Sequence, residues 1–219
     1  MTGTQVLALI RAEIKDSGST KISDANALLA INKGIRAVNE ELILWDASEL
    51  FGVAVIMPIT AADDTLLLPS DFKSQQFIVL ERQESSEWKR VGEISPCDDR
   101  FLELYKNETG QPAAYKIKGV NLYIRPIPDA VYPYRFILYY YPKLDELMAL
   151  TESIPLSGVI DDVIVEYLRF WSMLSLEKAS NVDSALQGIV KARIYNIVSM
   201  RKPTFVEGGS LIETSNWEL

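Results

Sequence analysis

Three pairs of adjacent carboxylates are the clearest candidates for acid–base chemistry in this sequence: Asp63-Asp64, Asp98-Asp99 and Asp161-Asp162. A hydrolytic site needs two carboxylates that converge on one bond from facing elements. Adjacent residues point to opposite faces of a strand, and they diverge by about 100° on a helix. The pattern therefore predicts a turn for the first pair and helix N-terminal charge for the other two. A glycan hydrolase or ligand-binding domain that uses distant carboxylates stays open as the alternative function.

Nucleophilic and metal chemistry lacks its usual side chains. The chain has no histidine, which excludes Ser-His-Asp and Cys-His pairs and every zinc site that contains histidine. A single cysteine, Cys97, excludes an internal disulfide and a multi-cysteine metal cluster. Gly208-Gly209 follows a predicted helix and no strand, so it does not form a phosphate-binding loop. We expect no catalytic residue, no cofactor and no metal.

A run of tyrosines near the middle of the chain could stack on bases or sugars. If the segment is a strand, however, alternate side chains face the core, and core packing is the favoured interpretation. The tyrosines concerned are Tyr132, Tyr134, Tyr139, Tyr140 and Tyr141.

Composition predicts a soluble globular protein. The chain has 219 residues, 48% of them hydrophobic, which is enough for one sizeable core. Its net charge of −8 disfavours sequence-independent binding of nucleic acid, because an acidic surface repels phosphate. The most apolar stretch, residues 50–59, is about half as long as the ~20 residues of a membrane-spanning helix. With no cationic start either, we expect neither secretion nor membrane binding.

Both ends of the chain have the periodicity of amphipathic helices. Residues 3–16 place Val6, Leu9, Ile10 and Ile14 on one face, with Thr4 as a possible cap. A second helix begins after Ser23, and its apolar residues follow a 3-4 spacing that indicates packing along another helix. That seam comprises Leu28, Ile31, Ile35, Val38, Leu42 and Trp45; Asn32 and Asn39 fall on the side expected to face solvent.

Two further helices are predicted near the other end. The first begins near residue 157, and the second covers residues 183–200 and stops before Pro203. Their apolar faces comprise Ile160, Val163, Ile164, Tyr167, Trp171 and Leu174 in the first, and Leu186, Ile189, Val190, Ile194 and Ile197 in the second.

The middle of the chain, residues 51–144, has the period of β-strands. We expect a hairpin across Ser85-Ser86, a second around Gly119, and a short helix over residues 98–106. Residues 135–141 are bulky on both faces, which places this strand in the centre of its sheet.

The order of elements predicts an α+β fold in which N- and C-terminal helix pairs form one bundle with an inserted antiparallel β domain. We expect N-terminal helices over residues 1–50 and the β-rich domain over residues 51–145. The C-terminal helices take residues 146–202, and an extended tail takes residues 203–219.

The tail is rich in large apolar side chains for a segment without periodicity: Phe205, Leu211, Ile212 and Trp217. Disordered tails are normally depleted in such residues. Apolar anchors on an irregular segment suit binding to a partner surface. Folding back onto its own domain is an equal alternative.

Several turn and strand motifs resemble the head-to-tail adaptor proteins of tailed bacteriophages, also called head completion or tail tubular proteins of short-tailed phages. The resemblance spans residues 3–200 and includes the order of helices and strands. The motifs are Leu67-Leu68-Pro69-Ser70-Asp71-Phe72, Gly110-Gln111-Pro112-Ala113-Ala114-Tyr115-Lys116-Ile117-Lys118-Gly119, Leu122-Tyr123-Ile124-Arg125-Pro126-Ile127-Pro128 and Leu138-Tyr139-Tyr140-Tyr141-Pro142-Lys143-Leu144.

The resemblance implies a structural role without catalysis. Such adaptors assemble as rings of about twelve copies beneath the portal protein, and rings of this kind form by head-to-tail contacts between subunits. The ring would extend the DNA channel without binding DNA specifically, and it would offer a docking platform for the tail nozzle. We expect a virion protein, assembled in the host cytoplasm, whose tail residues Phe205, Leu211, Ile212 and Trp217 bind the portal.

Overall fold

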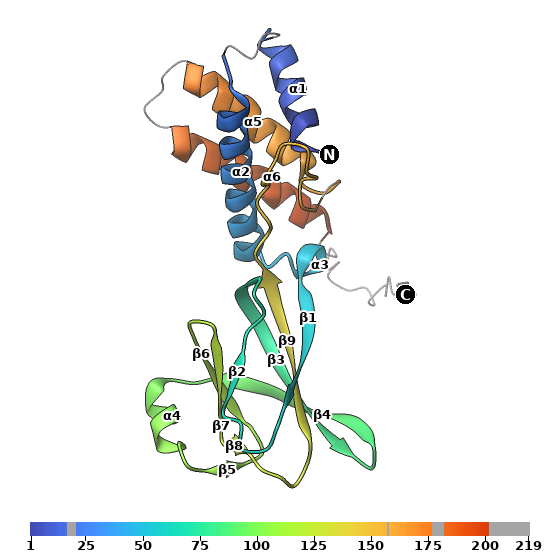
Figure 1. Ribbon diagram of the computed structural model, residues 1–219, viewed down its shortest axis with the longest axis vertical. Helices are drawn as coiled ribbons and strands as arrows, with labels where there is room; N and C mark the ends of the chain where they lie inside the picture. Colours follow the sequence, from blue (N-terminus) through green and yellow to red (C-terminus); the bar gives the residue numbers. More distant parts are fainter. Residues whose placement is uncertain (17–20, 157, 177–181, 202–219) are drawn as a thin grey trace, which may run out of the picture.

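The protein is elongated, with a helical bundle at one end and a β-sheet at the other (Figure 1). The computed structural model describes residues 1–16, 21–156, 158–176 and 182–201. The helices are α1 (Gly3–Glu13), α2 (Asp24–Leu44), α3 (Ser48–Phe51), α4 (Asp99–Leu104), α5 (Asp161–Leu176) and α6 (Val182–Arg201). The predicted α+β class is confirmed, and N- and C-terminal helices pack into the same hydrophobic core.

Helix α2 is the central element of the bundle. It begins after Ser23, whose side chain accepts a hydrogen bond from the backbone N–H of Asn26 as predicted. The predicted seam is buried at its centre, where Ile31, Ile35, Val38 and Leu42 are fully buried. Small residues widen this buried face and let neighbouring helices approach closely; they are Ala27, Ala30 and Gly34.

Helix α1 differs from the prediction in its cap and in one face residue. Its N-cap is Thr2 rather than Thr4, and Thr2 forms a reciprocal capping box with Gln5. Leu9 is 47% exposed, whereas Leu7 is buried. The buried positions follow the i, i+3, i+4, i+7 pattern from Gly3 to Ile10, and residue 9 lies off that stripe.

The predicted faces of the two C-terminal helices are largely buried in the bundle. The buried residues of α5 are Val163, Ile164, Tyr167, Leu168 and Ser172, and those of α6 include Leu186, Val190, Ile194 and Val198. Both helices contact α2, so the chain's two ends close on each other as expected.

The sheet is mixed rather than purely antiparallel, which corrects the prediction. Its seven strands follow the order β1-β9-β3-β4-β6-β7-β2, and β4 pairs with β6 in parallel. The chain passes through α4 between these two strands, and such a crossover lets the second strand run in the same direction. The strands are β1 (Val53–Ile59), β2 (Thr65–Leu67), β3 (Phe72–Glu84), β4 (Glu87–Pro96), β6 (Ala114–Lys118), β7 (Asn121–Arg125) and β9 (Tyr134–Pro142), with β5 (Thr109–Gly110) and β8 (Ile127–Pro128) as a separate pair.

Strand β9 is an interior strand, but it stands second in the strand order rather than in the centre of the sheet as predicted. It pairs with β1 on one side and with β3 on the other. Both predicted hairpins form, and Ser85 and Ser86 both take the left-handed conformation that a two-residue turn between twisted strands requires. The two edge strands, β1 and β2, are joined by residues 60–64 alone, so the sheet curls into a nearly closed, barrel-like form.

Two hydrophobic clusters follow this architecture. One fills the bundle and the other fills the curled sheet. The division into domains at residues 50, 145 and 202 stays a prediction, and the tail at residues 203–219 lies outside the described residues.

Replacing Ile35 with aspartate should unfold the bundle. Ile35 is fully buried among apolar side chains. An unpaired buried charge there costs on the order of 3–5 kcal/mol. Leu29→Asp on the same helix is the matched control, because Leu29 is 55% exposed. Thermal denaturation should show a large drop in melting temperature for Ile35→Asp only. Equal melting temperatures for the two variants would contradict a buried seam.

Gly34 marks a close approach between α2 and α5. A Cβ at this position would lie 3.0 Å from Cδ1 of Tyr167 and 3.3 Å from Cδ1 of Ile164. Gly34→Val should therefore lower the free energy of unfolding by about 1–3 kcal/mol. The same substitution at Gly188, where a Cβ meets nothing within 4 Å, should change it by less than about 0.5 kcal/mol. Denaturant titration compares the two variants.

Candidate functional site

The junction between bundle and sheet is held by side chains that contact both parts. Tyr141, near the end of β9, packs its ring against Phe51 with centroids 5.1 Å apart. Its hydroxyl donates a hydrogen bond to the carboxylate of Asp46, in the loop after α2. Asn39 of α2 donates from Nδ2 to the carbonyl of Pro142 at 3.2 Å. The strand that enters the bundle is thus fixed to two helices at once.

The chain beyond β9 is also tied along α2. Asn32 donates from Nδ2 to the carbonyl of Leu147 and accepts from the N–H of Leu147 through Oδ1, both at 2.9 Å. The prediction that Asn32 and Asn39 face solvent is therefore wrong, since Asn32 is half-buried and Asn39 is buried. The two residues lie seven positions apart, on one helix face, and that spacing is the signal by which they could have been found.

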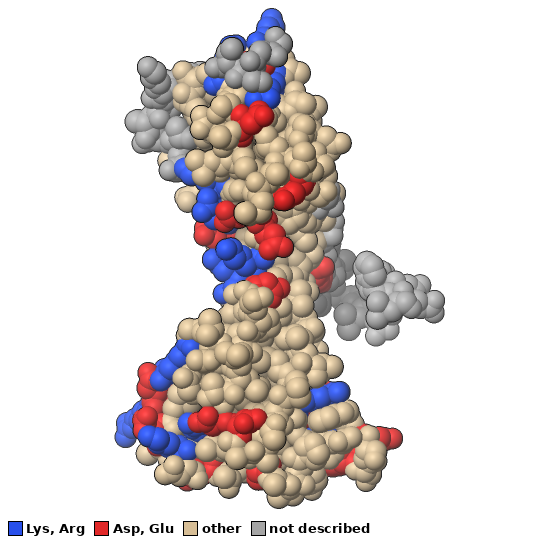
Figure 2. Space-filling model, viewed as in Figure 1, with Lys and Arg blue, Asp and Glu red and all other residues tan. Residues whose placement is uncertain are grey.

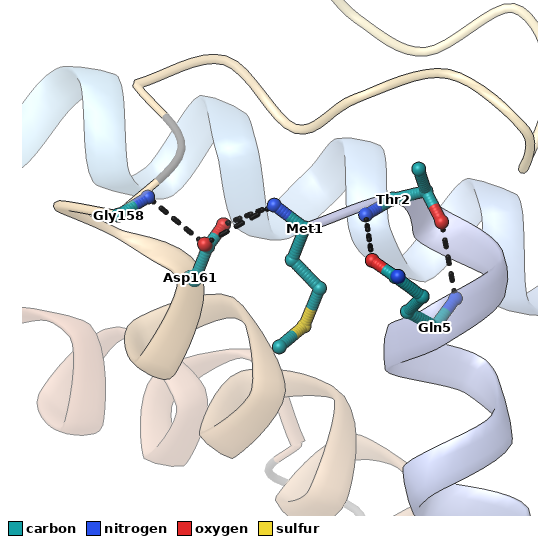
Figure 3. A network of polar contacts seen from close by, with 5 residues as sticks. All are labelled: Met1, Thr2, Gln5, Gly158 and Asp161. Carbon is teal, nitrogen blue, oxygen red and sulfur yellow. Dashed lines mark hydrogen bonds and ion pairs between the residues drawn. The ribbon is translucent and has the colours of Figure 1, made fainter.

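The N-terminal segment is pinned against the start of α5 (Figure 3). The ammonium group of Met1 lies 3.2 Å from Oδ2 of Asp161, and the N–H of Gly158 donates to the same oxygen at 2.9 Å. The backbone of Met1 also accepts from the N–H of Ile154 at 2.9 Å. Asp161 was predicted as helix N-terminal charge, which it is, but its distant ionic partner has no signature in the sequence.

Both residues of the first carboxylate pair, Asp63 and Asp64, have structural roles. Asp63 accepts a hydrogen bond from the N–H of Thr60 and so closes the predicted turn. Asp64 lies 3.1 Å from the guanidinium of Arg125, which is buried. Arg125 also donates to the carbonyl of Leu102, so this ion pair joins β7, α4 and the start of β2. A buried guanidinium needs such partners, because an unpaired charge in the interior is costly.

The second pair sits at the start of α4. Asp98 is the N-cap, and its side chain accepts from the N–H of Phe101 at 2.8 Å. Asp99 forms ion pairs with Lys116, at 2.9 Å, and with Lys118. Hydrogen bonds from Lys118 and Lys116 lower the pKa of Asp99, so this carboxyl stays ionised and is a poor proton donor. The three carboxylate pairs do not converge on a common site.

Cys97 and the tyrosine run are also accounted for by packing. Burial, and to a smaller extent the charge of Asp98, raises the pKa of the Cys97 thiol, which disfavours the reactive thiolate. Of the tyrosines, Tyr134, Tyr140 and Tyr141 are buried, so the run is not an open stacking platform. Within the described residues, no cluster of three or more acidic or cysteine side chains could hold a metal ion.

On the face shown in Figure 2, charged side chains lie along the bundle and around the far rim of the sheet, and fewer lie between these two regions. On the bundle, a groove of about 450 Å³ between α5 and α6 is bordered by ion-paired arginines. Arg193 pairs there with Glu166, and Arg169 pairs with Glu13. No helix in the described part of the chain is long and apolar enough to cross a membrane.

An apolar surface covers the outer face of β1, β9 and β3. Ile56 of β1 is 55% exposed and lies opposite Ile137 of β9. Beside them, Phe77 of β3 stacks on Tyr139 of β9 with ring centroids 4.3 Å apart, and Phe77 is 37% exposed. Single exposed apolar residues are ordinary, but a contiguous group suits contact with another protein surface.

The comparison with protein families decides what kind of protein this is. The family model of the SU10 adaptor protein matches residues 1–196. The chain belongs to the SU10 adaptor protein family. Its members are phage adaptor proteins, so the resemblance found in the sequence is confirmed. A comparison with curated proteins found no match. Family membership indicates a structural, non-enzymatic virion protein, and the carboxylate contacts above agree with that role. The predicted portal-binding residues Phe205, Leu211, Ile212 and Trp217 lie outside the described residues.

The adaptor should lose stability at high pH through Tyr140. Burial, followed by the hydrogen bond to Asp71, raises the pKa of Tyr140 from 10 to about 12. The folded protein therefore holds this proton more tightly than the unfolded chain. The resulting stabilisation is complete below pH 10 and disappears as the pH rises through 12. In Tyr140→Phe, the decline in the free energy of unfolding between pH 10 and 12 should be smaller by about 2 kcal/mol.

Denaturant titrations between pH 9 and 12 measure the effect. Tyr139→Phe is the matched control, because Tyr139 lies next in sequence on the opposite face of β9. This substitution leaves the hydrogen bond between Tyr140 and Asp71 in place, so the decline that depends on that bond should persist. An identical decline in the Tyr140→Phe variant would contradict the assignment.

Proposed function

We propose that this adaptor forms a ring under the portal of a tailed phage, extends the DNA channel, and provides the docking platform for the tail nozzle. The family match over residues 1–196 carries the proposal. The copy number expected from the resemblance is about twelve, closed by one repeated head-to-tail contact.

The architecture supports a role between two partners. The bundle and the sheet lie at opposite ends of an elongated molecule (Figure 1), so each can contact a different neighbour. Contacts such as Tyr141 with Asp46 and Asn39 with Pro142 hold the two ends in one orientation. A fixed orientation lets every subunit of a ring repeat the same contact.

The charge of the chain supports passage of DNA without binding. At a net charge of −8 the protein repels phosphate overall, and a channel built from such subunits would let DNA slide. In this proposal, no residue recognises a base or holds a phosphate.

The tail and the sheet loops are the proposed contact points. Phe205, Leu211, Ile212 and Trp217 would be apolar anchors on the portal, since large side chains that enter pockets dominate binding energy. The loops of the β domain, farthest from the bundle, would meet the nozzle.

Mixing the purified adaptor with its portal protein tests the proposal. Native mass measurement and electron microscopy should show portal-bound rings of adaptor. The test uses the mixture and not the adaptor alone, because the portal can serve as the template on which the ring forms. Failure of the two proteins to associate would overturn the proposal.

Cutting the chain after Lys202 should abolish incorporation into particles. Circular dichroism should still show a folded bundle and sheet, because every described helix and strand lies before that cut. Trp217→Ala should weaken portal binding at least tenfold, as hot-spot aromatics often do, and Asn216→Ala is the matched control. Normal incorporation of the truncated chain would show that the tail is not the portal anchor.

A further inference from the structure

Strand β1 leaves one edge unpaired in the described part of the chain. It pairs with β9 on one side only and stands at the end of the strand order. No residue from Val53 to Ile59 is charged, and Ile56 and Val53 are 55% and 38% exposed. Proteins usually protect such an edge with charged side chains or a covering segment, because it otherwise pairs with other chains. Here Pro58 is the single protective residue.

The backbone of β1 offers hydrogen-bonding groups to a further strand. Pro58 has no N–H, so it is suited to a position whose backbone faces away from β9. Strand backbones alternate with a period of two, so Ala54 and Ile56 share this orientation. Their N–H and C=O groups then point to the free edge and can pair with an added strand.

The chain leaves the bundle beside this edge. Tyr195 of α6 packs against Trp45, at the end of α2, with ring centroids 5.1 Å apart. From Tyr195 the helix advances about 9 Å to Arg201. Helix α6 ends next to α3 and the beginning of β1 (Figure 1). Residues 202–219 therefore start within a short distance of the free edge.

The composition of those residues suits a β-strand. Thr204, Phe205 and Val206 all favour strands and follow directly after Pro203, which stops the helix. Fully extended, residues 202–219 would span up to about 60 Å. Strand β1, with seven residues, is about 23 Å long. The segment can thus reach along the whole edge.

We propose that residues 203–219 of the same chain cover β1 in the unassembled adaptor, with residues 204–207 added as a strand parallel to β1. The added strand satisfies the edge groups of Ala54 and Ile56. Phe205 would then lie over apolar surface near Ile56. The proposal does not depend on the portal role of the tail: the free chain keeps its edge covered, and capture of the tail by a partner would uncover it.

Hydrogen exchange on the full chain, resolved by residue with NMR, tests the proposal. The amides of Ala54, Ile56 and Val206 should exchange at least tenfold more slowly in the wild type than in Phe205→Asp. Ser215→Asp adds the same charge outside the proposed strand and should exchange like the wild type. A tenfold dilution should leave the slow exchange unchanged, because the strand comes from the same molecule.

Three outcomes would overturn the proposal. Fast exchange at Ala54 and Ile56 in the wild type would show an open edge. Slow exchange that persists in Phe205→Asp would show that something other than this strand covers it. Slow exchange that disappears on dilution would assign the strand to a second copy. None of these outcomes bears on portal binding, which the mixing experiment measures separately.

Discussion

The orientation of the sheet on the bundle depends on a few contacts around the end of β9. Tyr141 belongs to the strand by its backbone pairing and to the bundle core by its side chain. Its hydroxyl reaches Asp46, while Asn39 holds the next carbonyl along the chain. Each such hydrogen bond contributes only about 1 kcal/mol net, but leaving a buried partner unsatisfied costs more. The junction is therefore specific in geometry even though no single contact dominates it.

Charged side chains elsewhere in the protein also connect separate elements. Buried or half-buried charges such as Arg125 and Asp161 connect elements that are far apart in sequence, with partners at Asp64 and Met1. The carboxylates that first suggested acid–base chemistry close a turn, cap α4 or form ion pairs. These contacts agree with the structural role that membership of a phage adaptor family indicates.

The ion pairs of the bundle and the apolar side chains of the outer sheet face lie on different parts of the molecule. Ion pairs such as Arg193 with Glu166 lie on the bundle, where solvent screens them and they contribute little to stability. The outer face around Ile56 and Phe77 is apolar, and it borders the edge of β1 that no described strand pairs with. Burial of apolar area drives most protein association, so this face has more to gain from a covering partner than the bundle flank has.

Elements with local signals could be predicted from the amino-acid sequence. The 3-4 spacing around Ile35 predicted the buried face of α2, and Ser23 predicted where that helix begins. The bulky alternation of residues 135–141 predicted a strand inside the sheet, and β9 does pair with β1 on one side and β3 on the other. Turn and strand motifs in order were enough to indicate the adaptor family.

Pairings between distant residues could not be predicted and became visible in the folded chain. The parallel contact of β4 with β6, the bond of Asn39 to Pro142 and the ion pair of Met1 with Asp161 join segments that share no local pattern. An asparagine in a helix is predicted to face solvent when its hydrogen-bond partner belongs to a segment far away in the sequence. Periodicity reports which face of an element is buried, whereas the partner of a polar group depends on where the rest of the chain comes to lie.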